Sequence, residues 1–186
     1  MERIRRQLKK YTPWNSQEES DLKTILYAID HMNDLLTRDN PIAHFTASAW
    51  IVNPDRTHAL MVWHNIYKAW AWTGGHADGE SDLLKVALKE ATEETGIQNI
   101  FPVTENLYSI EVLTVNPHIK RGKFVSSHLH LNATYLLEAD DSQSIACKPD
   151  ENSAVGWRTL LEAGISADEP LMSPIYTKLN EKLMMF

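Results

Sequence analysis

The chain has 186 residues, a formal net charge of −7, 43% hydrophobic residues and a single cysteine. This length and composition favour one domain with an extension, because they allow a sizeable hydrophobic core. Because Cys147 is the only cysteine in the sequence, an intramolecular disulfide is excluded, and a reducing, cytoplasmic location is favoured. The acidic balance argues against a nucleic-acid polymer as partner. No apolar run approaches the roughly 18 residues that span a membrane, so no membrane partner is expected.

A helical region is predicted over residues 1–38. Ser16 to Glu19 (SQEE) is typical of a capping box, and apolar residues recur at helical spacing from Leu22 to Leu36. We assign residues 1–40 to a helical extension packed on the domain, and residues 41–186 to the domain itself. The same apolar stripe would also suit a dimer contact, so the sequence leaves a homodimer open.

From His44 the apolar period becomes that of strands. The segments HFTASAWIV and THALMVWHN, joined by the turn NPDR, predict a β-hairpin. A second pair of strands is predicted in LYSIEVLTV and VSSHLHLNATYLLEA, separated by a loop from Pro117 to Lys123. A helix is expected to start near Thr159, and SPIYTKLNEKLMMF is typical of an amphipathic terminal helix.

The run GGHADGESDLLKVALKEATEETGI, residues 74–97, is the most informative part of the chain. Gly79 can supply a turn, Ser81 is the predicted N-cap, and Gly96 is the predicted left-handed C-cap. Residues 82–95 should therefore be helical. At about 100° per residue, one side of this helix is apolar and faces a core.

Three carboxylates occupy another side of the predicted helix. Glu90, Glu93 and Glu94 gather within an arc of roughly 100° and repel one another at this spacing. A hard cation would reverse that repulsion, and few carboxylates together with substrate phosphates are the usual arrangement for Mg²⁺. A solvated acidic helix face is the alternative. The glycines at a fixed distance before the acids favour the metal site.

This segment resembles the signature of the Nudix hydrolase family, Gly-x5-Glu-x7-Arg-Glu-U-x-Glu-Glu-x-Gly-U, where U is aliphatic. The signature positions correspond to Gly75, Ser81, Lys89, Glu90, Ala91, Glu93, Glu94, Gly96 and Ile97. Ser81 stands where the family has Glu, with Glu80 one residue early, and Lys89 stands where the family has Arg. In the family these two positions typically form a salt bridge that braces the helix. We expect Ser81 to brace it as a cap; the alternative is a pair between Glu80 and Lys89.

The resemblance implies an α/β/α sandwich around a mixed β-sheet, and a hydrolase that acts on a phosphorus anhydride. The implied substrate is a small molecule, a nucleoside diphosphate linked to another group, and the implied cofactor is Mg²⁺ or Mn²⁺. By the same resemblance, the metal ligands are the Gly74 carbonyl, Glu90, Glu93 and Glu94. Glu151 resembles the distal acidic residue that many members bring from a loop. The general base is left open among Glu90, Glu93 and Glu151.

Aromatic residues and histidines near the signature are candidates for substrate binding. Trp70, Trp72 and His76 are placed in this group, because aromatic rings can stack on a nucleobase and His76 could approach a phosphate or the metal. Core packing and a surface histidine are the respective alternatives. His128 and His130 share one face of a predicted strand. Zinc is the less favoured interpretation of this pair, because no third histidine or cysteine is near in sequence.

Two functions of other classes remain open. A non-catalytic sensor that binds a nucleotide is conceivable because Ser81 and Lys89 depart from the signature, although the three helix glutamates are retained. An isomerase of the isopentenyl diphosphate type shares the fold and a metal site. That reaction normally needs a cysteine, and Cys147 lies away from the expected cleft.

Overall fold

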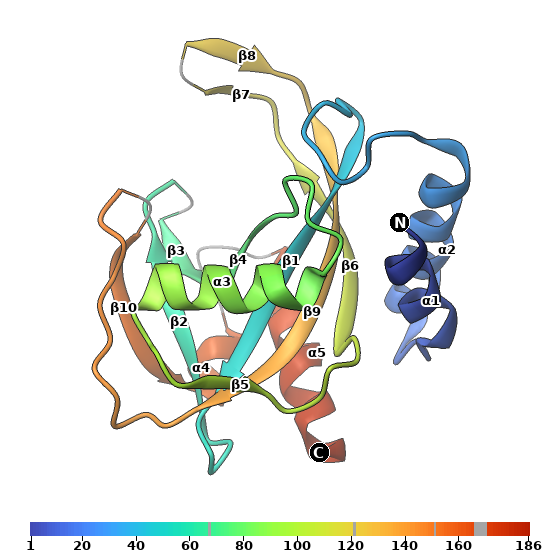
Figure 1. Ribbon diagram of the computed structural model, residues 1–186. Coiled ribbons are helices and arrows are strands. Elements are labelled where there is room, and N and C mark those ends of the chain that lie inside the picture. The colour runs from blue at the N-terminus through green and yellow to red at the C-terminus, as the bar shows by residue number, and fades with distance from the viewer. Residues whose placement is uncertain (67, 121, 151, 166–170) are drawn as a thin grey trace.

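The computed structural model describes residues 1–66, 68–120, 122–150, 152–165 and 171–186, and a mixed sheet forms its centre (Figure 1). The helices are α1 (Glu2–Lys10), α2 (Ser16–His31), α3 (Leu83–Thr95), α4 (Leu160–Gly164) and α5 (Ser173–Lys182), followed by a 3₁₀ turn at Leu183–Met185. The strands are β1 (Ala43–Val52), β2 (His58–His64), β3 (Ala69–Ala71), β4 (Thr73–His76), β5 (Ile100–Pro102), β6 (Ser109–Val115), β7 (His118–Lys120), β8 (Lys123–Val125), β9 (His128–Ala139) and β10 (Asn152–Thr159).

Within the described residues, eight strands form one sheet. Its main path is β10-β2-β1-β9-β5, with β3 paired to β2, β4 to β1 and β6 to β9. The central strands β1 and β9 run parallel, and the other pairs are antiparallel. The predicted pairings of β1 with β2 and of β6 with β9 are confirmed. The predicted loop from Pro117 to Lys123 is wrong in part, because it contains a small hairpin of β7 and β8 whose turn uses Gly122 at φ +77°.

Helices cover both faces of the sheet. All ten residues of β1 are buried, as expected for a strand covered on both sides. Ala47 and Ala49 pack in one core with Ala87 of α3, whereas Trp50 points to the other face and stacks on Tyr176 of α5. Figure 1 shows α3 in front of the sheet, with α4 and α5 behind it. This is the α/β/α sandwich with a mixed sheet that the sequence predicted.

The N-terminal helices pack beside β6, in the same core as α3. The predicted capping box at Ser16 is wrong, because Asn15 is the N-cap and its side chain accepts a hydrogen bond from the Glu18 N–H. The helix also ends earlier than predicted, since Met32 is extended (φ −120°, ψ 149°). Ile4 and Leu8 are buried in the core. Among the described residues, no helix has the length and apolar character required to cross a membrane.

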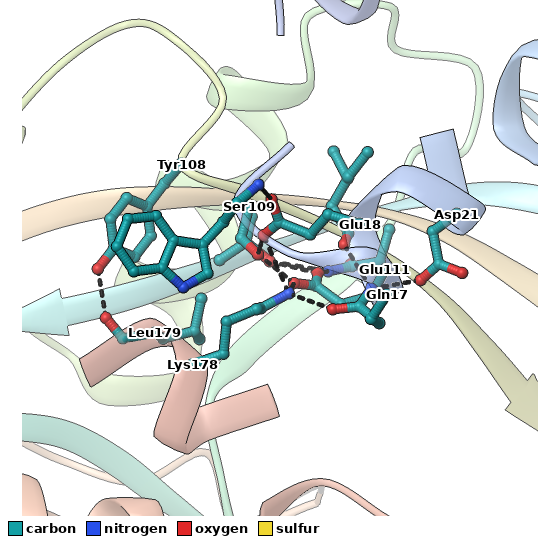
Figure 2. A network of polar contacts seen from close by, with 12 residues as sticks. Gln17, Glu18, Asp21, Tyr108, Ser109, Glu111, Lys178 and Leu179 are labelled. Carbon is teal, nitrogen blue, oxygen red and sulfur yellow. Dashed lines mark hydrogen bonds and ion pairs between the residues drawn. The ribbon is translucent and has the colours of Figure 1, made fainter. Parts of the chain in front are cut away.

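A buried polar network connects α2, β6 and α5 (Figure 2). Lys178 Nζ donates to Glu111 at 2.9 Å and to Gln17 at 2.7 Å, and lies 3.1 Å from Glu18. Lys182 Nζ donates to Glu18 at 2.9 Å. Glu18 and Glu111 are completely buried, and both lysines are nearly so. The network therefore ties the first and last thirds of the chain together through charge-assisted hydrogen bonds.

Glu18 makes the stability of the fold dependent on pH. Burial acts to raise the pKa of its carboxyl, but hydrogen bonds from Tyr11 and Lys182 and the charge of Lys178 outweigh it and lower the pKa from 4.5 to about 2. Because the folded pKa is the lower one, this stabilisation is present above about pH 4.5 and is lost as the pH falls towards 2. The loss should be about 3 kcal/mol.

Urea unfolding of the wild type and of Glu18→Gln between about pH 5 and about pH 2 measures this loss. The free energy of unfolding should fall more steeply with acid in the wild type. Parallel curves would contradict the role of Glu18.

Candidate functional site

Helix α3 carries the predicted carboxylates. Its C-terminus is as predicted: Gly96 adopts φ 71°, and its N–H donates to the Thr92 carbonyl at 2.9 Å. Its N-terminus differs, because Asp82 and not Ser81 is the N-cap and accepts a hydrogen bond from the Lys85 N–H. The Asp82 carboxylate also pairs with Arg3 of α1 at 2.9 Å. An aspartate caps as well as a serine does and adds a negative charge where the helix dipole favours one.

The alternative brace, a pair between Glu80 and Lys89, is not formed either. Glu80 accepts a hydrogen bond from the Asp82 N–H and pairs with Lys85 at 2.9 Å. Both contacts lower the pKa of Glu80, and the hydrogen bond from the Asp82 N–H has the larger effect. Lys85 replaces Lys89 because it stands in the first turn, close to Glu80, whereas Lys89 lies one turn further along the helix. Lys89 instead contacts Glu90 and Glu93.

The observed cap gives a stability prediction. Asp82→Ala is expected to cost about 0.5–2 kcal/mol in the free energy of unfolding, because it removes the cap and the pair with Arg3. Ser81→Ala is the matched control and should stay within about 0.5 kcal/mol. Thermal melts of both variants measure the difference. A larger loss in Ser81→Ala than in Asp82→Ala would show that Ser81 is the cap after all.

Glu94 is the most firmly held of the three helix carboxylates. It is 5% exposed, in contrast to Glu93, whose side chain is 43% exposed. One oxygen of Glu94 accepts a hydrogen bond from the Gly74 N–H at 2.9 Å, and the other accepts from the Asn152 side-chain amide at 3.0 Å. These contacts hold the C-terminal half of α3 against β4 and β10. They also fix the direction of the carboxylate.

Two glycines of β4 allow this close approach. A Cβ at Gly75 would lie 2.5 Å from Cδ of Glu90, and a Cβ at Gly74 would lie 2.5 Å from Oγ of Ser48. Any side chain at Gly75 would therefore displace the Glu90 carboxylate. Both glycines lie in a strand paired with β1, and Gly79, at φ +95°, provides the turn that follows.

Glu90 and Glu93 share the Lys89 ammonium group, and Asn152 has an oxygen without a hydrogen-bond partner among the described residues. Lys89 Nζ lies 3.2 Å from Glu90 Oε1 and 3.5 Å from Glu93 Oε2, and the hydrogen bond to Glu90 raises the pKa of Lys89. The buried Oδ1 of Asn152 has no hydrogen-bond partner among the described residues. Oxygen donors around a position that attracts positive charge fit a hard divalent cation such as Mg²⁺ or Mn²⁺.

Asn152 is a site residue that the sequence did not predict. Only the folded structure shows that its side chain contacts Glu94. The neighbouring Glu151, predicted as the distal acid, lies outside the described residues.

The predicted aromatic residues lie on and next to β3. Trp70 packs edge-on to Trp63 with ring centres 5.8 Å apart, and the Arg158 guanidinium lies 5.1 Å from its ring centre. Trp72 packs edge-on to Tyr176 at 5.5 Å. Both tryptophans are half-buried and pack against the core that contains Trp50 and Tyr176. Substrate binding by Trp70 and Trp72 stays a prediction.

His76, at the end of β4, lies beside His44 and His130. The structure thus brings two further histidines, from distant parts of the sequence, to the predicted one.

The family is shown by comparison with known proteins. The family model described as the NUDIX domain matches residues 43–179. The chain therefore belongs to the Nudix hydrolase family. No curated protein matches it.

Solved structures share the fold at low identity. An Ap4A hydrolase from C. elegans in a binary complex is 20% identical, with a TM-score of 0.57 over 76% of this chain and 98% of the other. The Nudix hydrolase RenU from M. smegmatis is 14% identical, with a TM-score of 0.56 over 77% and 87%. The dihydroneopterin triphosphate pyrophosphohydrolase of E. coli is 14% identical, with a TM-score of 0.55 over 76% and 94%. At these identities the likeness concerns the fold alone.

Proposed function

We propose that this protein is a metal-dependent hydrolase that cleaves a diphosphate bond in a nucleoside diphosphate linked to another group. The observation that carries the proposal is the buried Glu94 carboxylate, held by Gly74 and Asn152 on the same helix as Glu90 and Glu93. Family membership supports it, since similar structures are named a hydrolase of Ap4A and a pyrophosphohydrolase of dihydroneopterin triphosphate.

The residues that would hold one or more Mg²⁺ or Mn²⁺ ions are Glu90, Glu93, Glu94 and the Gly74 carbonyl. Such an ion, when bound, offsets the charge of diphosphate oxygens and lowers the pKa of the attacking water. Gly75 leaves room for the Glu90 carboxylate, and Asn152 orients that of Glu94.

A carboxylate then takes the proton of the attacking water. Both oxygens of Glu94 already accept hydrogen bonds, which favours Glu90 and Glu93 as the base. Glu151 remains a third candidate.

The substrate in this proposal is a small nucleotide derivative. Trp70 and Trp72 would contact its base. Stacking of a base on an aromatic ring contributes about 1–3 kcal/mol. The proposal includes a cytoplasmic location, with residues 1–40 as a packed extension of the domain, and leaves the homodimer open.

A product assay separates this proposal from the two other functions. The full chain is incubated with Mg²⁺ and a panel of nucleoside triphosphates, dinucleoside polyphosphates, nucleoside diphosphate sugars, dinucleotide cofactors and isopentenyl diphosphate. The expected result is two phosphate-containing products from at least one nucleotide. Binding without turnover would favour a sensor, and rearrangement of the isoprenoid without cleavage would favour an isomerase. Either result alone would overturn the proposal.

A further inference from the structure

Three histidines from separate strands meet on one face of the sheet. His44 of β1 pairs with His130 of β9 in the parallel register, and His76 ends β4 beside them. Their ring centres lie 4.8–5.1 Å apart, and one ring nitrogen from each lies within 4.8 Å of the others. His128 stands next to this group, with its ring centre 4.9 Å from that of His44.

Two of these histidines hold buried nitrogens that lack a partner. Nε2 of His44 and Nε2 of His130 make no hydrogen bond among the described residues, although His44 is only 4% exposed. Nδ1 of His44 lies 3.3 Å from the Asn40 carbonyl. A proton on Nδ1 would be donated to that carbonyl, which leaves the lone pair of Nε2 directed to a ligand. A backbone carbonyl of this kind is the usual support for a metal-bound histidine.

We propose that His44, His76 and His130 bind a Zn²⁺ ion through their ring nitrogens, with a fourth position left for water or His128. In a tetrahedral site with Zn–N distances of about 2.0–2.1 Å, imidazole ring centres lie about 5 Å apart. The observed ring spacing therefore suits zinc, and rotation of the side chains would bring the ring nitrogens, now within 4.8 Å of one another, to the roughly 3.3 Å that tetrahedral zinc requires. Neutral imidazoles prefer zinc to magnesium or calcium.

The electrostatics of the cluster favour a metal over an anion. Burial lowers the pKa of His130 to about 3 and also lowers that of His44. Both rings are therefore neutral near pH 7 and have a lone pair available. A neutral ring cannot attract a phosphate by charge.

This site is separate from the carboxylates of α3. Side chains alternate along β4, so the face of Gly75 that meets Glu90 is opposite to the face of His76. The zinc would join the ends of three strands, including the strand that contains the two glycines of the carboxylate site. Zinc binding would thus stabilise β4 without depending on hydrolysis.

The test measures zinc on the full, untagged chain after treatment with a chelator. Equilibrium dialysis with Zn²⁺, followed by elemental analysis, should give one tightly held ion per chain. At a concentration about 100-fold above the dissociation constant, Zn²⁺ should raise the melting temperature by about 5–10 °C. Co²⁺ in place of Zn²⁺ should give the visible absorption of a tetrahedral ion.

Two variants test whether the histidines hold the zinc ion. His76→Asn and His130→Asn should both lose the tight zinc and the melting shift, with circular dichroism of the metal-free proteins as the check of folding. His76 is only partly buried, so its replacement spares the core. The exposed His31→Asn is the matched control and should keep the ion.

Zinc retained by both cluster variants would overturn the proposal, as would no tight zinc in the wild type. Zinc lost from Glu93→Gln but kept by the cluster variants would also overturn it, since that result assigns zinc to the carboxylates. Hydrolysis is not part of the readout, so this proposal and the proposed function can fail independently.

Discussion

Replacing Glu94 by glutamine is expected to lower turnover by about 10²-fold or more while leaving the fold intact. Both oxygens of Glu94 accept hydrogen bonds, from the Gly74 N–H and from the Asn152 amide. A glutamine would turn its own NH₂ group towards one of these donors, and it would remove the charge that a divalent cation requires. The measurement is kcat at saturating metal and substrate, together with a thermal melt.

The control for this variant is Glu105→Gln, which changes an exposed glutamate between β5 and β6. It should keep the wild-type kcat. Near-normal turnover of Glu94→Gln with unchanged metal dependence would mean that Glu94 is not a ligand.

Lys178→Met is expected to destabilise the protein by about 3–5 kcal/mol. The substitution leaves Glu111 and Glu18 buried with fewer positive partners, although Lys182 still contacts Glu18. An uncompensated buried charge costs far more than a lost surface ion pair. Urea unfolding at neutral pH measures the change in the free energy of unfolding.

Lys23→Met, on the exposed side of α2, is the matched control and should change stability by less than about 0.5 kcal/mol. Glu111→Gln added to Lys178→Met removes the orphaned charge, so the double variant should lose less stability than the sum of the single variants. A loss below about 1 kcal/mol in Lys178→Met, or strict additivity, would contradict the account of the network.

Local signals in the sequence predicted the local structure well. Gly96 marks the end of α3, and the β-branched and aromatic residues on either side of the turn NPDR mark the hairpin of β1 and β2. The two N-caps were predicted one residue away from their observed positions. Asn15 and Ser16, like Ser81 and Asp82, are adjacent residues that can both cap a helix, so only the backbone geometry decides between them.

Contacts between distant segments could not be predicted in this way. His44 meets His130 only because β1 and β9 pair in parallel, and a parallel pairing leaves no turn signal in the sequence. Lys178 occurs in an amphipathic pattern that suits a solvated helix face, yet it is buried against Glu111 of β6. Asn152 likewise reaches Glu94 only through the position of β10.

Removal of metal tests the proposed hydrolase most directly. The full chain is treated exhaustively with a chelator and assayed on a substrate that the product assay identifies, first without metal and then with Mg²⁺, Mn²⁺ or Zn²⁺ added. We expect turnover to fall to the uncatalysed rate without metal and to return with Mg²⁺ or Mn²⁺. The carboxylates of α3 and the diphosphate are both negatively charged, so a bound cation is needed to offset the charge of the substrate. Turnover that survives complete removal of metal would contradict the account.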